Sequence, residues 1–199
     1  MLSRRGFLSV AGVGAAAAAG SLVSMPAVAD DKKKDKKWDV VVVGAGMAGL
    51  VCAITAHDAG AKVCVIEKAD RPDGNSIYAL GSVNAWGTKW QKECGIEDTK
   101  DAFFKDMMKV SAGRADPALT MTYTEEIPAS VDWLQDEIGI KFGKVKTAPW
   151  PKLGRGLRPV TEGGLTGGSV LIQSLLKAAH KRNIPFFFEH KAVQLLVGK

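Results

Sequence analysis

The segment of residues 38–67, WDVVVVGAGMAGLVCAITAHDAGAKVCVIE, constrains the fold of this chain more than any other part of the sequence. It opens on four valines at residues 40–43, which predict a strand buried on both faces of a parallel sheet. A second apolar run at residues 62–66 predicts another strand, and the stretch between the two runs has the apolar spacing of a helix. Together these parts predict a βαβ unit and, with it, a Rossmann-like α/β fold with a parallel sheet core.

Three glycines follow the first predicted strand and indicate a ligand. Gly44, Gly46 and Gly49 fit the pattern G-x-G-x-x-G, in which the glycines permit the turn, the approach of a pyrophosphate and close packing of the helix. Glu67 stands at the end of the second run, near the offset of about 20 residues at which a carboxylate receives a ribose hydroxyl. We therefore predict a dinucleotide site, with the phosphates at the helix start and an unphosphorylated ribose. A purely structural βαβ unit without a ligand is the alternative.

The remainder of the chain is predicted to alternate between polar loops and short elements. Residues 74–85, GNSIYALGSVNA, are mostly small residues and amides, which suit either close approach of the backbone to a flat ligand or a surface turn. Residues 143–168 form a long Gly/Pro/Lys-rich loop, and loops of this length are usually functional or mobile. Helices are expected at residues 101–110, 118–126, 128–138 with Pro128 in the first turn, and 169–182 with Ser169 as cap, and strands at residues 184–188 and 192–197.

The composition limits the chain to one domain and excludes several functions. With 199 residues and 46% hydrophobic content, the chain can bury one core but not two large ones. The formal charge of +6 is concentrated in short runs without interleaved aromatic residues, so we expect no nucleic-acid surface. The three cysteines have neither metal-ligand nor haem-attachment spacing. We expect Cys52 and Cys64 in the core and Cys94 at the surface.

Residues 1–29 are typical of an export signal, with a charged start, an apolar stretch and a small-residue cleavage site at residues 27–29. SRRGFL at residues 3–8 resembles the twin-arginine signal, which addresses proteins exported already folded. An ordinary secretory signal and an uncleaved anchor are the alternatives. Residues 30–37, DDKKKDKK, predict a charged linker, with a membrane-surface tether as the alternative, before a folded domain at residues 38–199. We therefore expect a periplasmic protein with no stable membrane span after signal cleavage.

Four segments resemble the flavoprotein family of fumarate reductase and succinate dehydrogenase, particularly the periplasmic fumarate reductases of flavocytochrome c type and the related urocanate and methacrylate reductases. The segments are GAGMAGL at residues 44–50 together with Glu67, GNSIYALGSVNA at residues 74–85, SVDWL at residues 130–134, and RPVTEGGLTGGSVLIQSLLKAAHKRNI at residues 158–184. The combination is more specific than any single motif. It favours FAD over NAD as the cofactor of a FAD-binding domain.

The resemblance implies a role for eight residues. As in the family, Gly44, Gly46, Gly49 and Glu67 would bind the adenosine and pyrophosphate of FAD, Asn75, Ser76 and Gly81 the middle of the cofactor, and Ala192 would lie on the adenine-side strand. The chain departs from the family pattern at Ser82, where a second glycine is usual, at Leu157, where a histidine is common, and at residues 160–162, which enlarge a loop. These departures bear on the flavin-side geometry and on the choice of substrate.

The family reaction passes hydride from reduced FAD to an activated double bond, which implies an unsaturated carboxylate as substrate. Family and compartment imply a separate electron donor such as a cytochrome c. Members of the family run to several hundred residues, and their capping domain and catalytic arginine have no matching position in these 199 residues. We therefore assign no catalytic residue, and neither Arg155 nor Arg158 is given that role. Two alternatives stay open: a truncated or split-gene FAD-binding fragment without independent catalysis, and an NAD-dependent dehydrogenase.

Overall fold

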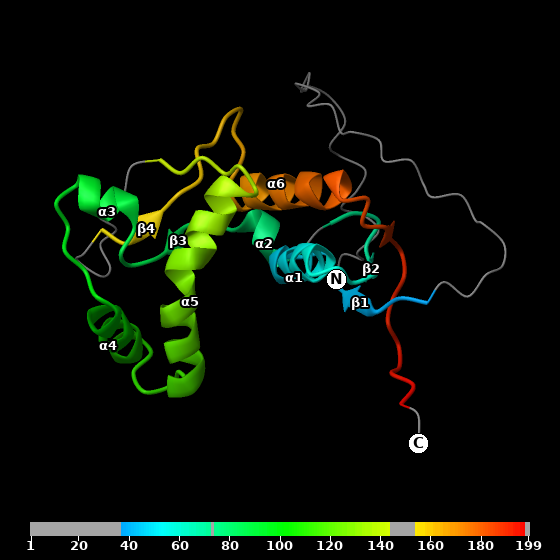
Figure 1. The fold of residues 1–199 in the computed structure, drawn as a ribbon, viewed down its shortest axis with the longest axis horizontal. Helices are drawn as coiled ribbons and strands as arrows, with labels where there is room; N and C mark the ends of the chain where they lie inside the picture. Colours follow the sequence, from blue (N-terminus) through cyan, green and yellow to red (C-terminus); the bar gives the residue numbers. More distant parts are fainter. Residues whose placement is uncertain (1–36, 73, 144–153, 198–199) are drawn as a thin grey trace, which may run out of the picture. The chain divides into compact units, whose positions relative to one another are not determined.

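The computed structural model describes residues 37–72, 74–143 and 154–197, which Figure 1 draws as a coloured ribbon. The predicted signal peptide at residues 1–29 lies outside the described residues, and so does the predicted linker at residues 30–37 apart from its last residue. All the described residues belong to one unit that begins at Lys37.

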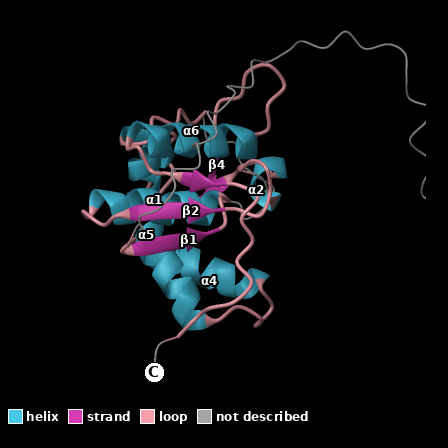
Figure 2. Cartoon of the chain, turned by 90° about the vertical axis from the view of Figure 1, so that its right-hand side faces the viewer, coloured by secondary structure: helices cyan, strands magenta, loops and turns pink. Residues whose placement is uncertain are grey.

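The predicted βαβ unit is present. Strand β1 (Val40–Val43), helix α1 (Met47–Asp58) and strand β2 (Val63–Ile66) follow one another along the chain. Strand β1 pairs with β2 in parallel along its whole length, and the two lie side by side in Figure 2. Strand β5 (Phe186–Phe187) pairs in parallel with the other edge of β2, so the sheet order is β1-β2-β5. The prediction of an α/β fold with a parallel sheet is confirmed.

Strand β1 is buried on one face only. Val42 is 7% exposed and its Cγ1 lies against α1, at 3.3 Å from the place that a Cβ on Gly49 would take. Val41 and Val43 are 49% and 61% exposed, because alternate residues of a strand point to opposite faces. The prediction that β1 is buried on both faces is therefore wrong for the described residues. Among them, β1 is the edge strand of the sheet, and α1 covers only one of its faces.

The other elements form a helical region that is joined to the βαβ unit through a common core. The helices are α2 (Asn75–Tyr78), α3 (Lys89–Glu93), α4 (Lys100–Val110), α5 (Pro117–Asp136) and α6 (Gly167–Lys181). A short antiparallel pair of strands, β3 (Val83–Asn84) and β4 (Gly156–Leu157), connects segments far apart in the sequence. Helix α6 packs against α1 and α2, and α4 packs against α5. One cluster of buried hydrophobic residues includes side chains of the βαβ unit, α4, α5 and α6.

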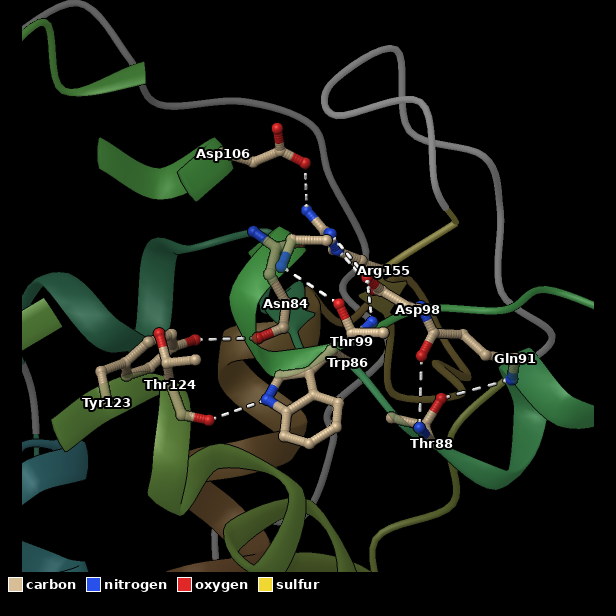
Figure 3. A network of polar contacts seen from close by, with 11 residues as sticks. Asn84, Trp86, Thr88, Gln91, Asp98, Thr99, Asp106, Tyr123, Thr124 and Arg155 are labelled. Atoms are coloured by element: carbon tan, nitrogen blue, oxygen red, sulfur yellow. Dashed lines mark hydrogen bonds and ion pairs between the residues drawn. The ribbon is translucent and has the colours of Figure 1, made fainter. Parts of the chain in front are cut away.

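Helix α5 runs without a break through Pro128, where the sequence pattern predicted the start of a second helix. Proline has no N–H to donate to the carbonyl four residues earlier, which here belongs to Thr124. The indole N–H of Trp86 donates to that carbonyl oxygen at 2.8 Å (Figure 3). The prediction of two helices was wrong because a side chain distant in the sequence replaces the missing backbone hydrogen bond.

Helix α6 begins earlier than predicted. Thr166, not Ser169, is its N-cap: the Oγ1 of Thr166 accepts a hydrogen bond from the N–H of Ser169 at 3.1 Å. Both residues are good caps, so the local pattern allowed either. Thr166 is the N-cap because the hydroxyl groups of both residues contact α2, and these long-range contacts cannot be read from the local sequence.

Two further expectations are corrected. Residues 192–197 do not form a strand, and Val193 is 85% exposed, because no neighbouring strand pairs with this segment within the described residues. Cys52 is exposed instead of buried, since it lies on α1 next to the positions that face the core. Cys64 is buried and Cys94 is exposed, as predicted.

Candidate functional site

A cleft of about 440 Å³ lies beside the start of α1. Its lining comes from the loop before α1, the segment after β2, and α2, and consists of Gly46, Glu67, Lys68, Ala69, Gly74, Asn75 and Tyr78. Because β1 and β2 are parallel, their carboxyl ends meet at this edge of the sheet, where ligands of such sheets bind. The structure thus brings together three predicted site residues, Gly46, Glu67 and Asn75.

The three glycines of the βαβ unit differ in what they contribute. Gly44 has a φ of 102°, which side chains rarely allow, and turns the chain after β1. A Cβ on Gly49 would lie 2.0 Å from the carbonyl oxygen of Gly44, so α1 can pack this closely only with glycine there. A Cβ on Gly46 would meet nothing within 4 Å. Gly44 and Gly49 therefore shape the backbone, whereas Gly46 leaves open space in the cleft.

The first turn of α1 offers backbone donors to this space. The N-cap is Gly46, which has no side chain to accept the free N–H groups, and no acidic residue lies in the first turn of α1. Free N–H groups and the helix dipole favour an anion at such a position. The arrangement therefore suits the phosphate groups of a dinucleotide.

Glu67 is held at the cleft by main-chain donors. Its Oε2 accepts the N–H of Ala45 at 2.8 Å, and its Oε1 accepts the N–H of Ala69 at 2.9 Å. Burial acts to raise the pKa of Glu67, but these hydrogen bonds outweigh burial and lower the pKa below its ordinary value of 4.5. The carboxylate is ionised at neutral pH and retains acceptor capacity for the hydroxyls of a ribose.

The remaining predicted site residues do not line the cleft. A Cβ on Gly81 would lie 2.3 Å from the carbonyl carbon of Gly167, and a Cβ on Gly168 would lie 2.0 Å from the carbonyl oxygen of Ser76. These distances place Gly81 and Ser76 against the first turn of α6. Ala192 lies in the exposed segment that follows β5.

Four lining residues were missed by sequence reasoning: Lys68, Ala69, Gly74 and Tyr78. The first two directly follow Glu67, and the other two lie in the small-residue segment, so their positions were a usable signal. Tyr78 is 71% exposed, and a ligand in the cleft would cover part of its ring.

A second polar cluster surrounds Arg155, which does not line the cleft. Its guanidinium donates to both carboxylate oxygens of Asp98, at 2.5 and 2.6 Å, and to Asp106 at 2.7 Å (Figure 3). The side chains of Arg155 and Asp98 are 0% exposed, and the ring of Phe103 lies 4.8 Å from the guanidinium carbon. Burial favours loss of the Arg155 charge, but the two aspartates outweigh it and raise the pKa of Arg155.

These contacts give Arg155 a structural role. Its charge is neutralised by aspartates 49 and 57 residues away, a separation that hides the ion pair from sequence patterns. Within the ranges that the structure describes, no group of three or more His, Cys, Asp or Glu side chains could hold a metal ion. Over the same ranges, no helix combines the length and apolar character needed to cross a bilayer.

The parallel sheet, the glycine turn, the open start of α1 and the carboxylate of Glu67 define a dinucleotide-binding α/β protein. Residues 39–199 match the family model described as the FAD binding domain, and the chain belongs to this family. Its cofactor is FAD, so the predicted preference for FAD over NAD is confirmed.

Relatives and solved structures agree with this family. The NADH:fumarate oxidoreductase of Klebsiella pneumoniae is 36% identical over 163 residues, which cover 82% of this chain and 17% of the relative. The fumarate reductase (cytochrome) of Shewanella frigidimarina is 37% identical over 158 residues, or 79% of this chain and 27% of the relative. The open conformation of a flavocytochrome c3 fumarate reductase aligns with a TM-score of 0.70 at 34% identity, covering 79% of this chain and 28% of that one. The chain thus spans less than a third of each, and the predicted family resemblance is confirmed.

Proposed function

We propose that this chain forms the FAD-holding part of an exported oxidoreductase that reduces an unsaturated carboxylate. The observation that carries the proposal is the cleft where Gly46, Glu67 and Asn75 meet beside the open start of α1. Relatives that are fumarate reductases support the substrate class, because fumarate is an unsaturated dicarboxylate. A relative named fumarate reductase (cytochrome) supports a separate electron donor such as a cytochrome c.

The lining residues fit the ADP half of FAD. The N–H groups at the start of α1 would bind the pyrophosphate in the space that Gly46 leaves open. The ionised carboxylate of Glu67 would accept ribose hydroxyls, and the amide of Asn75 can both donate and accept hydrogen bonds. FAD, when bound, supplies the hydride chemistry, and these residues hold and orient it.

Titration of the purified chain with FAD tests the cofactor part of the proposal. We expect a saturable complex with the visible absorbance of bound flavin, and weaker binding by Glu67→Gln, which removes the charge that would face the ribose in the cleft. Glu97→Gln is the matched control, because Glu97 is exposed and does not line the cleft. Folded protein that takes up no FAD would overturn the proposal.

Oxidation of reduced viologen with fumarate tests catalysis by the same protein. Turnover that depends on fumarate supports a reductase. Bound FAD without turnover supports the alternative that these residues hold FAD but do not catalyse the reaction alone. Activity with fumarate compared against acrylate and urocanate measures which carboxylate the site accepts.

Export by the twin-arginine route is a separate part of the proposal, which rests on SRRGFL at residues 3–8. We expect that replacing Arg4 and Arg5 by lysine keeps the folded, FAD-loaded protein in the cytoplasm of a bacterial host. Changing Lys33 and Lys34 to arginine is the control, because it also exchanges two basic residues without changing the charge, outside that motif. Unchanged periplasmic yield of the double-lysine variant would contradict this route.

A further inference from the structure

Two hydroxyl groups at the start of α6 meet one carbonyl oxygen of α2. The Oγ1 of Thr166 lies 2.8 Å from the carbonyl oxygen of Ile77, and the Oγ of Ser169 lies 3.1 Å from it. The two hydroxyl oxygens are 2.9 Å apart. Because the Oγ1 of Thr166 also accepts the N–H of Ser169, one threonine both starts α6 and binds α2.

The main chains of the two helices are in direct contact around these hydroxyls. The N–H of Gly168 donates to the carbonyl oxygen of Ala79 at 2.9 Å. A Cβ on Gly167 would lie 2.1 Å from the carbonyl oxygen of Leu80, so no larger residue fits between the segments. The end of α2 therefore rests on the first turn of α6 through three hydrogen bonds and a tight backbone contact.

The contact between α2 and α6 determines the position of the cleft residues that lie on α2. Helix α2 is a single turn, its N-cap Gly74 has no side chain, and one turn of helix is not stable by itself. Asn75 and Tyr78, at the two ends of α2, both line the cleft. Their positions relative to Glu67 thus depend on how α2 is held by α6.

We propose that Thr166 and Ser169 are positioning residues for FAD: through the carbonyl of Ile77 they hold α2 so that Asn75 and Tyr78 face the cofactor. The inference rests on the proposed role of the cleft as the FAD site. Loss of either hydroxyl leaves the partly buried Ile77 carbonyl with one fewer donor, which frees α2 to shift. The expected consequence is a change in FAD binding without a direct contact between these hydroxyls and FAD.

The test compares FAD affinity and the visible circular dichroism of bound FAD in Thr166→Val, Thr166→Ser and Thr99→Val. Thr99 is a matched control, because its Oγ1 caps α4 by accepting the N–H of Ala102 at 3.2 Å and α4 packs on α5. Both valine variants lose a cap and should melt at lowered temperatures, with the larger decrease in Thr166→Val, which also loses the hydrogen bond to Ile77. Only Thr166→Val should weaken FAD binding, by roughly five- to tenfold, and alter the flavin spectrum. Thr166→Ser keeps the hydroxyl and should bind FAD within about twofold of the unsubstituted chain.

If Thr166→Val does not fold, Ser169→Ala replaces it in the test. Ser169→Ala removes one hydroxyl from Ile77 but keeps Thr166 as the cap of α6. It should weaken FAD binding in the same direction. If the unsubstituted chain binds no FAD, both the proposed function and this inference are overturned. If the unsubstituted chain binds FAD and the folded variants bind it equally tightly with the same spectrum, the inference alone is overturned.

Discussion

Replacing Arg155 by methionine tests how strongly the buried ion pair stabilises the fold. The side chains of Arg155 and Asp98 are both 0% exposed, and hydrogen bonds of 2.5 and 2.6 Å join them. In the variant, the buried carboxylate keeps donors from Gln91 at 3.0 Å and from the N–H of Thr99 at 2.9 Å. Removing one partner of a buried pair costs about 3–5 kcal/mol. We expect a loss of about 3 kcal/mol in the free energy of unfolding, at the lower end of that range, because these two donors remain.

Equilibrium denaturation by urea, followed by tryptophan fluorescence, measures this loss. The control is Arg182→Met, because Arg182 also makes two hydrogen bonds to one carboxylate, that of Asp58, at 2.7 and 2.8 Å. The side chains of that pair are 20% and 41% exposed, so water screens it and its loss should cost about 0–1 kcal/mol. A loss in Arg155→Met no larger than that in Arg182→Met would refute the reasoning.

The pH dependence of the same variant gives a second measurement. Burial acts to raise the pKa of Asp98, but Arg155 and Gln91 outweigh burial and lower the pKa below its ordinary value of 3.8. The ionised Asp98 thus stabilises the fold above pH 3.8, and this contribution is lost as the pH falls through the lowered pKa. Without the guanidinium the pKa of Asp98 should rise, so the stability deficit of Arg155→Met should be smaller at about pH 5 than at about pH 8.

Three further predictions concern the glycine turn, α5 and Glu67. Gly49→Ala puts a Cβ 2.0 Å from a carbonyl oxygen and should lower the melting temperature of the apoprotein. Gly46→Ala should leave the melting temperature of the apoprotein unchanged, but FAD should raise the melting temperature of this variant by less than it raises that of the unsubstituted chain. Trp86→Phe removes the donor to the carbonyl that Pro128 leaves unpaired, at a cost of about 1–3 kcal/mol in urea denaturation, and adding Pro128→Ala should restore most of it by supplying an N–H. Because the pKa of Glu67 lies below 4.5, its carboxylate stabilises the fold above that pH, and this contribution is lost as the pH falls through the lowered pKa. In Glu67→Gln the free energy of unfolding should therefore decrease less as the pH is lowered.

Each of these has a contradicting result. Equal melting temperatures of the two glycine apoprotein variants would contradict the close-packing role of Gly49. If the changes in the free energy of unfolding caused by Trp86→Phe and Pro128→Ala simply add in the double variant, the indole does not stabilise the carbonyl that Pro128 leaves unpaired. Acid denaturation that is identical with glutamine in place of Glu67 would show that its carboxylate does not contribute to stability.

The parts of the fold predicted well from the sequence are those encoded by neighbouring residues. The valine run, the three glycines and Glu67 lie within one short segment, and each has a local physical meaning: a strand, a turn, a close contact and an acceptor. The cofactor also followed from sequence, because several segments resembled one family. The structure then placed Gly46, Glu67 and Asn75 in one cleft.

The parts predicted poorly depend on partners distant in the sequence. Pro128 normally marks a helix start, and only the approach of Trp86 lets α5 continue through it. Arg155 could have been a free cation in a loop, and only the fold brings Asp98 and Asp106 to it. The close contact of Gly81 with the start of α6 joins segments 86 residues apart, which no local pattern indicates.

By itself, the sequence determined the βαβ unit, because local periodicity and glycine spacing act over short distances along the chain, and the resemblance of several segments to one family indicated FAD. The tertiary structure decided which face of β1 is buried, where α6 begins and what holds α2 beside Glu67. Those outcomes depend on hydrogen bonds across 89 and 92 residues, such as those from Thr166 and Ser169 to Ile77. The energy of such contacts exists only once the segments have met, so no local pattern encodes it.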